Sequence, residues 1–463
     1  MIARHILPLA AASVLVAPWT LAPAEAKSLA PRPERVTLPN GLPVLVVERH
    51  DLPIVSVDLV LRAGGVNEAA NEHGLASLTA NLLTKGTPTR TAQAIADEID
   101  ALGASLGAGA DPDKSEVELN VLKSDLDHGL ALMGDVVSHP TFPAAELDKA
   151  KNLESAGLRT ALDDPGTVTG LAASQGLFDH TAYGRPLSGG LAALATLQQV
   201  DVQRFYQANY RPDRGFMVVV GDITPAEVRQ HFAKPFADWK APATMPGLTV
   251  EHPQPTGWKG ARLVPMDLTQ ANIKVAYPAI ARNHPDYFPL VVATQILGGG
   301  YLSRLYKNVR EEQGLAYSVG ASNVLRQSAG TTVIGLQTKE EAAAQALKSV
   351  IAQVDDLRNR PVPAPELAAI KRFFLGKFPR DLEANSDLAS MVSAVTFYGL
   401  PEDYFDRFVS RIQAVTAQDV QRVARKYFDP AHRQVTIVGH QNVLAKVAAP
   451  YGPVVVVNKT DLI

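Results

Sequence analysis

An internal repeat is the feature that most constrains the fold of this chain. Asp201-Val202-Gln203-Arg204 recurs 218 residues later (201 to 419) as Asp419-Val420-Gln421-Arg422. Three further segments match at the same offset, namely Tyr210 and Pro212 with Phe428 and Pro430, Val218-Val219-Val220-Gly221 with Thr436-Ile437-Val438-Gly439, and Val55 and Val57 with Ile273 and Val275. Four matches in one register indicate a duplicated domain.

The repeat divides the chain into two domains, residues 27–240 and 261–463, because the Pro- and Gly-rich stretch 241–260 is typical of a linker. Residues 1–26 indicate a signal peptide. A basic start (Arg4, His5) precedes an apolar run of about 12 residues, too short to span ~30 Å of hydrocarbon as a helix. Ala24-Glu25-Ala26 supplies a small-x-small cleavage pattern. We expect an exported, periplasmic or secreted protein with no membrane span after cleavage.

The pattern of apolar residues favours an α+β fold. Val44–Val47 and the alternating Val55–Leu61 predict neighbouring strands, and Met217–Val220 predicts a later one. Helical periodicity covers the ranges 75–83, 92–102, 147–158 and 192–205, and a further helix begins at Thr224-Pro225. Strands and helices are clustered without a βαβ rhythm. Each domain is therefore expected to be a mostly antiparallel sheet packed with helices.

Composition excludes several classes of function. The 44 basic and 47 acidic residues give a net charge of −3, and no block of like charges suggests a nucleic-acid partner. The chain has no cysteine, which excludes disulfides, thiolate nucleophiles and Cys-ligated zinc. None of the eleven histidines stands four residues from another, so a helical pair of His ligands is excluded.

Four segments together resemble the M16 (pitrilysin-like, inverzincin) metallopeptidases. The segment from Gly74 to Lys85-Gly86-Thr87 is similar to the family's zinc-binding helix, and the segment from His180 to Pro186 is similar to its H-x-Y-G-x-P turn. The segment from Asn209 to Asp222 is similar to the end of the family's first domain. The segment from Ser303-Arg304-Leu305 to Ser318 is similar to the motif S-R-L…R-E-x-x-G-L-A-Y-S. The resemblance covers essentially the whole mature chain. It implies two homologous domains in a clam-shell arrangement.

The family's zinc motif is absent from the matching segment. The resemblance places the two ligand histidines at Ser77 and Asn81, the general base at Ala80 and the distal Glu ligand at Gly157. Zinc hydrolysis needs three N or O ligands and a base for the bound water. We therefore expect no metal and no catalytic residue in this chain itself.

A second pair of family residues is retained. Arg310 and Tyr317 match residues that, by the resemblance, reach toward another domain's zinc site and hold the substrate. Arginine offers a planar fork of donors, and the Tyr hydroxyl can donate to a developing oxyanion. The alternative is that Arg310 is a solvated helix residue beside Glu311 and Glu312, and that Tyr317 merely begins a strand.

Two other motifs are weaker. Ala69 to His73 is a failed metal motif that lacks its first histidine. Gly103-Ala104-Ser105-Leu106-Gly107 matches the nucleophile elbow G-x-S-x-G, but a turn at Ala110 to Asp113 replaces the helix that an elbow requires. A small-residue strand is the better interpretation. In the family it is an edge strand beside the cleft, so Ala104 to Gly109 is a candidate for backbone pairing with substrate.

The resemblance implies a function shared between two chains. Some M16 peptidases pair a zinc-bearing chain with a similar one that lost the motif and supplies Arg and Tyr. We expect this chain to be such a non-catalytic subunit. It would form a heterodimer with a homologous zinc-bearing subunit and act on peptides or unfolded polypeptides. The rival hypotheses are a catalytically inactive structural or peptide-binding scaffold of the same fold and, more remotely, an active peptidase with an unrecognised site.

Overall fold

The computed structural model describes residues 32–241, 248 and 250–463. The predicted signal peptide (1–26) and part of the predicted linker lie outside these residues, and the limits of the two domains stay predictions. Among the described helices, none combines the length and apolar character needed to cross a bilayer.

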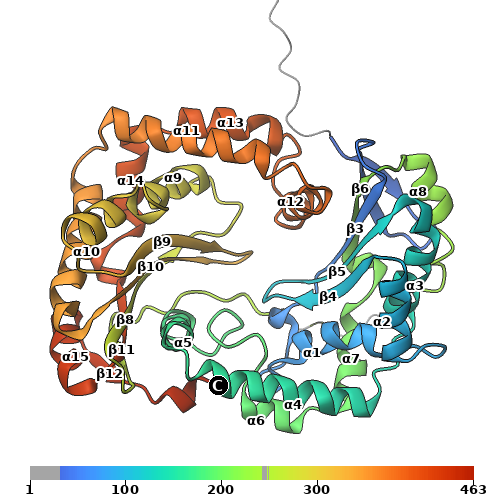
Figure 1. The fold of residues 1–463 in the computed structure, drawn as a ribbon, viewed down its shortest axis with the longest axis horizontal. Coiled ribbons are helices and arrows are strands. Elements are labelled where there is room, and N and C mark those ends of the chain that lie inside the picture. Colours follow the sequence, from blue (N-terminus) through green and yellow to red (C-terminus); the bar gives the residue numbers. More distant parts are fainter. Residues whose placement is uncertain (1–31, 242–247, 249) are drawn as a thin grey trace, which may run out of the picture.

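Each half of the chain builds one six-stranded sheet, and the two sheets stand at opposite ends of the molecule (Figure 1). The first sheet has the order β1-β2-β6-β3-β5-β4, and the second has the order β12-β7-β11-β8-β10-β9. The strands are β1 (Glu34–Thr37), β2 (Pro43–Glu48), β3 (Ile54–Leu61), β4 (Ser105–Ala110), β5 (Ser115–Leu122), β6 (Gly215–Gly221), β7 (Gly260–Pro265), β8 (Gln270–Ala279), β9 (Ser318–Leu325), β10 (Gly330–Lys339), β11 (Gln434–Gly439) and β12 (Val454–Val456).

Most neighbouring strands are antiparallel, as expected. In the first sheet β2 and β6 are parallel, and in the second β7 runs parallel to both β11 and β12. The prediction that β2 and β3 are neighbours is wrong, because β6 lies between them. The β6 residues from Phe216 to Gly221 are all buried, so this late strand needs a partner on each side, and alternation alone does not reveal strand order.

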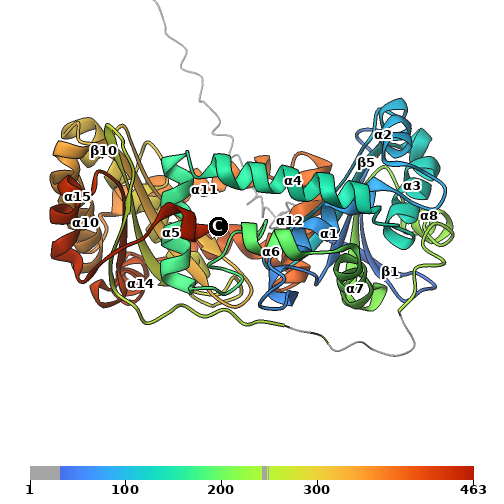
Figure 2. The ribbon, with the colours of Figure 1, turned by 90° about the horizontal axis from the view of Figure 1, so that it is seen from below.

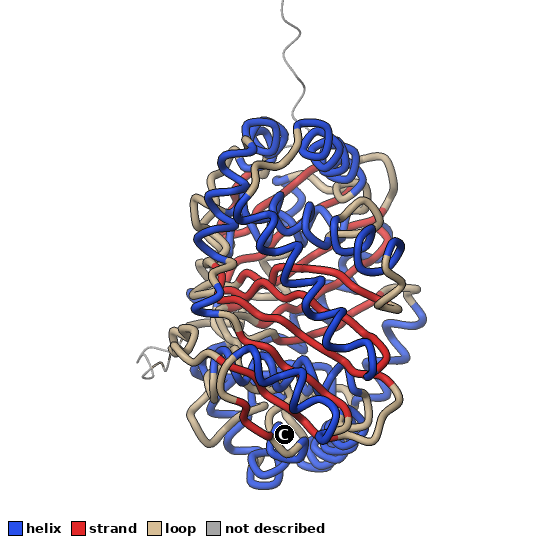
Figure 3. Tube along the Cα trace, turned by 90° about the vertical axis from the view of Figure 1, so that its left-hand side faces the viewer, coloured by secondary structure: helices blue, strands red, loops and turns tan. Residues whose placement is uncertain are grey.

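Helices cover both faces of the sheets and bridge between them (Figures 1 and 3). The helices are α1 (Leu75–Leu82), α2 (Ala92–Ala101), α3 (Leu126–Ser138), α4 (Ala144–Ala161), α5 (Pro165–Phe178), α6 (Leu191–Thr196), α7 (Gln199–Asn209), α8 (Pro225–His231), α9 (Tyr287–Gly298), the π-helix η5 (Tyr306–Glu312), α10 (Ala343–Asn359), α11 (Ala364–Arg380), α12 (Asn385–Phe397), α13 (Tyr404–Ala414), α14 (Ala417–Tyr427) and α15 (Gln441–Ala448).

The repeated Asp-Val-Gln-Arg segment has a local structural cause. Asp201 accepts a hydrogen bond from the amide of Gln198 at 2.9 Å, and Asp419 accepts one from the amide of Thr416 at 3.1 Å. Both carboxylates therefore satisfy backbone donors at the first turn of a helix, α7 in one half and α14 in the other. The same cap divides the single helix predicted over 192–205 into α6 and α7.

The two halves exchange one helix. α5 belongs to the first half but packs on β7, β8 and β11 of the second sheet, whereas α12 belongs to the second half and packs on β3 and β6 of the first (Figures 1 and 2). An offset of 218 residues superposes the two helices in sequence. We call the sheet face under the exchanged helix the inner face, and the opposite face the outer face. The main apolar core of each half lies on its outer face.

Candidate functional site

The first half of the site begins where the chain enters α1. Gly74 has a φ of 95°, and a side chain there would clash with the backbone of Ser188. The carboxylate of Glu68 accepts hydrogen bonds from the amides of Gly74 and Ala76 at 3.1 and 2.9 Å, and Arg185 lies 3.2 Å from it. Burial raises the pKa of Glu68 to about 7. These contacts fix the N-terminus of α1.

The predicted metal positions lie on two packed helices. Ser77 and Asn81 are one turn apart on α1, and the Asn81 side-chain amide donates to Glu154 of α4 at 3.3 Å. Gly157 follows Glu154 by three residues on α4, and a side chain there would meet open space. Ala80 is fully buried. The fold therefore directs the Ser77 and Asn81 face of α1 toward the α4 segment that carries Gly157.

The residues present do not fit zinc. Glu154 is a carboxylate beside the predicted metal positions that the sequence analysis does not identify. Its position one helical turn before Gly157 is the sequence feature that could have indicated it. Burial raises its pKa, and its neighbour Asn81 is a weak ligand. No group of three His, Asp or Glu side chains suited to a metal occurs within the described ranges. One carboxylate and one amide do not supply the three ligands and the base that a zinc hydrolase needs.

The two weaker motifs have structural explanations. Burial lowers the pKa of His73 to about 4, with Arg185 and His180 adding to the effect. The Gly103 to Gly107 segment leads into β4, the edge strand of the first sheet, which α1 packs against. No helix follows it, since β4 pairs with β5 in an antiparallel hairpin. The small-residue strand interpretation is confirmed.

Arg310 and Tyr317 lie on either side of the turn that leads into β9, the edge strand of the second sheet. Arg310 is on η5, and its guanidinium lies 4.8 Å from the ring centroid of Tyr306. Tyr317 directly precedes β9; its amide donates to the carbonyl of Gln337 at 2.9 Å, while the residue as a whole is 74% exposed. The turn between them requires Gly314, with a φ of 62°.

Neighbouring residues hold this segment rigidly. The guanidinium of Arg304 forms a bidentate pair with Glu366 at 2.8 Å and also bonds Asp356 at 2.8 Å. Leu305 and Val309 are fully buried on the core side of η5. The S-R-L part of the motif is therefore structural. Arg310 and Tyr317 use none of their side-chain donors in hydrogen bonds or ion pairs with other described residues.

Comparisons with known proteins agree with this architecture. Residues 44–187 match the family described as Insulinase (Peptidase family M16), and residues 196–374 match the Peptidase M16 inactive domain. A Bacillus subtilis protein named "Uncharacterized zinc protease YmxG" is 24% identical over 395 residues, which cover 85% of this chain and 95% of that protein. A Mycobacterium tuberculosis protein, also named an uncharacterized zinc protease, is 27% identical over 407 residues, covering 86% and 91%.

Solved structures share the fold over nearly the same length. The structure of a peptidase M16 inactive domain from Pseudomonas fluorescens has a TM-score of 0.82 and 27% identity, covering 88% of this chain and 98% of that chain. A protease from Helicobacter pylori has a TM-score of 0.80 at 21% identity. The fold is thus that of a two-domain metallopeptidase-type protein whose own metal positions hold no ligand set. The chain belongs to the M16 peptidase family.

Proposed function

We propose that this chain is the non-catalytic subunit of an exported, heterodimeric M16 zinc peptidase. Arg310 and Tyr317 bind and orient the peptide substrate, and a homologous partner subunit holds the zinc. The observation that carries the proposal is the pair of side chains beside β9. A rigid segment presents both, and their donors are not used by the fold.

The two side chains suit the peptide bond under attack. The hydroxyl of Tyr317 donates a hydrogen bond to the substrate carbonyl, whose oxygen gains negative charge as the bond is attacked. Arg310 adds a permanent positive charge and holds the neighbouring substrate backbone with its planar fork. A zinc ion held by the partner would supply the activated water. Substrate held between two chains would explain why this chain keeps the donors Arg310 and Tyr317 but has no group of metal ligands among its own described residues.

Turnover by the reconstituted complex tests the proposal. Tyr317→Phe removes only the hydroxyl donor and keeps the ring, so it should lower kcat about 10²–10³-fold, the usual cost of one oxyanion donor. Arg310→Lys keeps the charge but loses the fork, and it should fall between wild type and Arg310→Ala. The measurements are kcat and KM with the zinc-bearing partner, with size-exclusion chromatography to confirm assembly.

A matched control is Arg372→Ala, which removes an exposed arginine of α11 outside the motif and should leave kcat unchanged. Wild-type turnover in an assembled double variant, Arg310→Ala with Tyr317→Phe, would contradict the proposal and favour the scaffold. Equal activity of the partner with and without this chain would also contradict it.

The chain alone should hold no stoichiometric zinc and cleave no peptide. The reason is the donor set at Ser77, Asn81 and Gly157, which offers no imidazole and no carboxylate at any ligand position. Elemental analysis after gel filtration measures this directly. About one tightly held Zn²⁺ per chain would overturn the assignment of the metal to a partner.

A further inference from the structure

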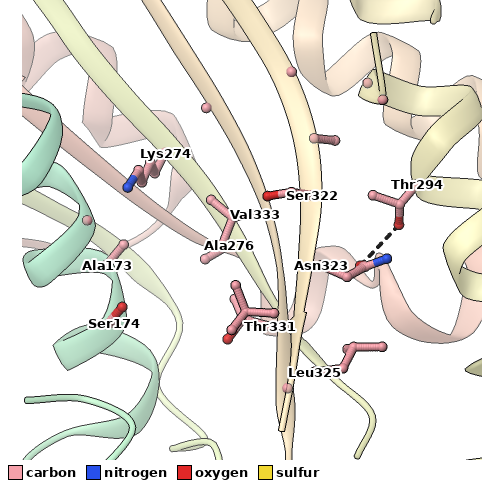
Figure 4. Close-up of a pocket in the computed structure, with 18 of the residues that line it drawn as sticks. Ala173, Ser174, Lys274, Ala276, Thr294, Ser322, Asn323, Leu325, Thr331 and Val333 are labelled. Atoms are coloured by element: carbon pink, nitrogen blue, oxygen red, sulfur yellow. Dashed lines mark hydrogen bonds between the residues drawn. The ribbon is translucent and has the colours of Figure 1, made fainter. Parts of the chain in front are cut away.

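A cavity of about 1170 Å³ lies around the β9 edge of the second sheet, with α5 on its inner-face side and α9 on its outer-face side (Figure 4). α5 covers β7, β8 and β11, whereas β10 and the edge strand β9 line the cavity. The inner positions of β9 and β10 are small or polar, as at Ser322 and Thr331. We call the inner-face part of this cavity, between α5 and the edge strand β9, the trough.

Lys274 of β8 reaches into this trough beside α5 (Figure 4). A methyl group at Gly170 of α5 would lie 2.7 Å from its amino nitrogen, so the amino group rests directly against the backbone of that helix. Gly335 stands opposite Lys274 on β10, and Gly320 stands opposite Gly335 on β9. No side chain therefore separates the amino group from the β9 edge along this row.

The Lys274 amino group has no direct ion-pair partner among the described residues, and the charge of Asp164, which raises its pKa, only partly offsets the effect of burial. It makes no hydrogen bond or ion pair with another described residue; the nearby carboxylate of Asp164 instead caps α5 by accepting from the Thr167 amide at 2.6 Å. Burying an unpaired cation costs free energy, and burial lowers the pKa of Lys274. A ligand carboxylate would supply the direct partner that Asp164 does not provide.

The cavity as a whole is basic. Its lining includes Arg282 and Arg326 besides Lys274, and among its described residues none is Asp or Glu. Both arginines already make cation–π contacts. The Arg282 guanidinium lies 3.8 Å from the ring centroid of Tyr287, and the Arg326 guanidinium lies 5.2 Å from that of Tyr183. Lys274 is the cation that remains without a partner in the described lining. Charge complementarity therefore points to an anionic ligand at Lys274.

We infer that this trough binds the C-terminal end of an extended peptide, with the terminal carboxylate at Lys274. The bound peptide enters over β9, crosses the sheet where Gly320 and Gly335 have no side chains, and ends against α5. That closed side favours a chain terminus over an internal acidic residue, because an internal residue needs an exit for the following chain. Free backbone groups of β9 and the polar Ser322 can pair with the incoming main chain. The inference rests on the proposed role in peptide binding but needs no partner subunit.

Fluorescence anisotropy with this chain alone tests the inference. The probes are three uncharged decapeptides labelled at the N-terminus: one with a free C-terminal carboxylate, one with a C-terminal amide, and one amidated with an internal Glu. The free acid should bind roughly tenfold to hundredfold more tightly than either amide, which is the scale of one charge-assisted hydrogen bond. Lys274→Met should abolish that preference.

Two further variants keep the test specific. Lys348→Met removes an exposed lysine of α10 and should leave binding unchanged. Gly335→Val keeps Lys274 but fills the trough, where a new Cβ meets no atom within 4 Å, so it should weaken the free acid without unfolding the sheet. The inference is overturned if acid and amide bind equally, if no probe binds, if the internal Glu restores tight binding, or if Lys274→Met retains the preference. The turnover assay with Tyr317→Phe is independent of these outcomes.

Discussion

The inner faces of the two sheets are equivalent by the repeat, yet their strands carry different charged residues. On the first sheet, Asp58 of β3 stands directly opposite Glu118 of β5, and Glu116, which pairs with Lys114, lies two residues along. On the second sheet the inner charges are Lys274 of β8 and Arg262 of β7. Burial raises the pKa of Asp58 and Glu116 and lowers the pKa of Lys274 and Arg262, so each face disfavours its own charge.

The outer faces of the same strands did not diverge in this way. Val55 and Val57 of β3 correspond to Ile273 and Val275 of β8, and all four are buried in the cores. Between them, Ser56 corresponds to Lys274. The duplication therefore preserved the alternate positions that hold each sheet on its helices. The positions that face the exchanged helices differ between the two halves. We expect a binding function at these positions rather than in the cores.

The exchanged helices differ as well. α12 packs on the first sheet with Phe397 at its C-terminal end, in an apolar cluster that includes Phe216 and Phe405. α5 packs on the second sheet through small side chains, among them Val168 and Ala172. Aromatic side chains thus fill the contact between α12 and the first sheet, whereas small side chains form the contact between α5 and the second sheet.

The largest expected effect tests this difference in cover. Phe397→Ala should lower the free energy of unfolding by about 3–5 kcal/mol, since the ring is 2% exposed and the guanidinium of Arg62 lies 5.0 Å from its centroid. Val168→Ala on α5 deletes two methyl groups and should cost about 2 kcal/mol. Urea unfolding measures both, and an equal loss would show that the two covers contribute alike.

The acidic inner face predicts a stability that falls as pH rises. Asp58 is buried; the hydroxyl of Ser393 on α12 donates to one of its oxygens, and the other oxygen has no partner among the described atoms. Burial, then the charge of Glu116, raises its pKa to about 7 from an ordinary 3.8. The native state holds the proton more tightly than the unfolded chain. This contribution is therefore complete below about pH 4 and is lost as pH rises through 7.

Asp58→Asn should remove most of that pH dependence, of the order of 2–4 kcal/mol between pH 4 and 8, because the amide stays neutral throughout. Glu116 keeps a smaller slope of the same sign, since burial raises its pKa too. The measurement is the free energy of unfolding at several pH values. Asp148→Asn, an exposed carboxylate of α4, should leave the profile of the wild type unchanged, and an unchanged profile in Asp58→Asn as well would contradict the assignment.

Much of the fold could be predicted from the sequence because local patterns encode it. The alternation in β3, the capped start of α8 at Thr224 and the repeated caps of α7 and α14 depend on neighbouring residues alone. The insertion of β6 between β2 and β3 and the exchange of α5 and α12 depend on long-range pairing, which periodicity does not report.

The candidate site likewise has residues that local sequence patterns reveal and residues that depend on long-range packing. The positions of Ser77, Asn81, Arg310 and Tyr317 follow from motif spacing, and the structure adds their exposure and supports. Lys274 was not foreseeable, because a lysine in an alternating strand is typical of a solvated face. Only the arrival of α5 from the other half of the chain buries it.

The smallest expected effect concerns Lys274 in the free protein. Its amino group is partly buried without a partner, so Lys274→Met should leave the free energy of unfolding at pH 7 unchanged or raise it by about 1 kcal/mol. Burial lowers the folded pKa of this lysine below the ordinary 10.5, so the unfolded chain binds the proton more tightly. The wild type should therefore gain stability as pH rises from the folded pKa toward 10.5, and the Met variant should lack that gain. Thermal unfolding at neutral and alkaline pH measures the difference. A clear loss of stability in Lys274→Met at pH 7 would mean that the amino group supports the fold, and that the basic inner face is as structural as the acidic one.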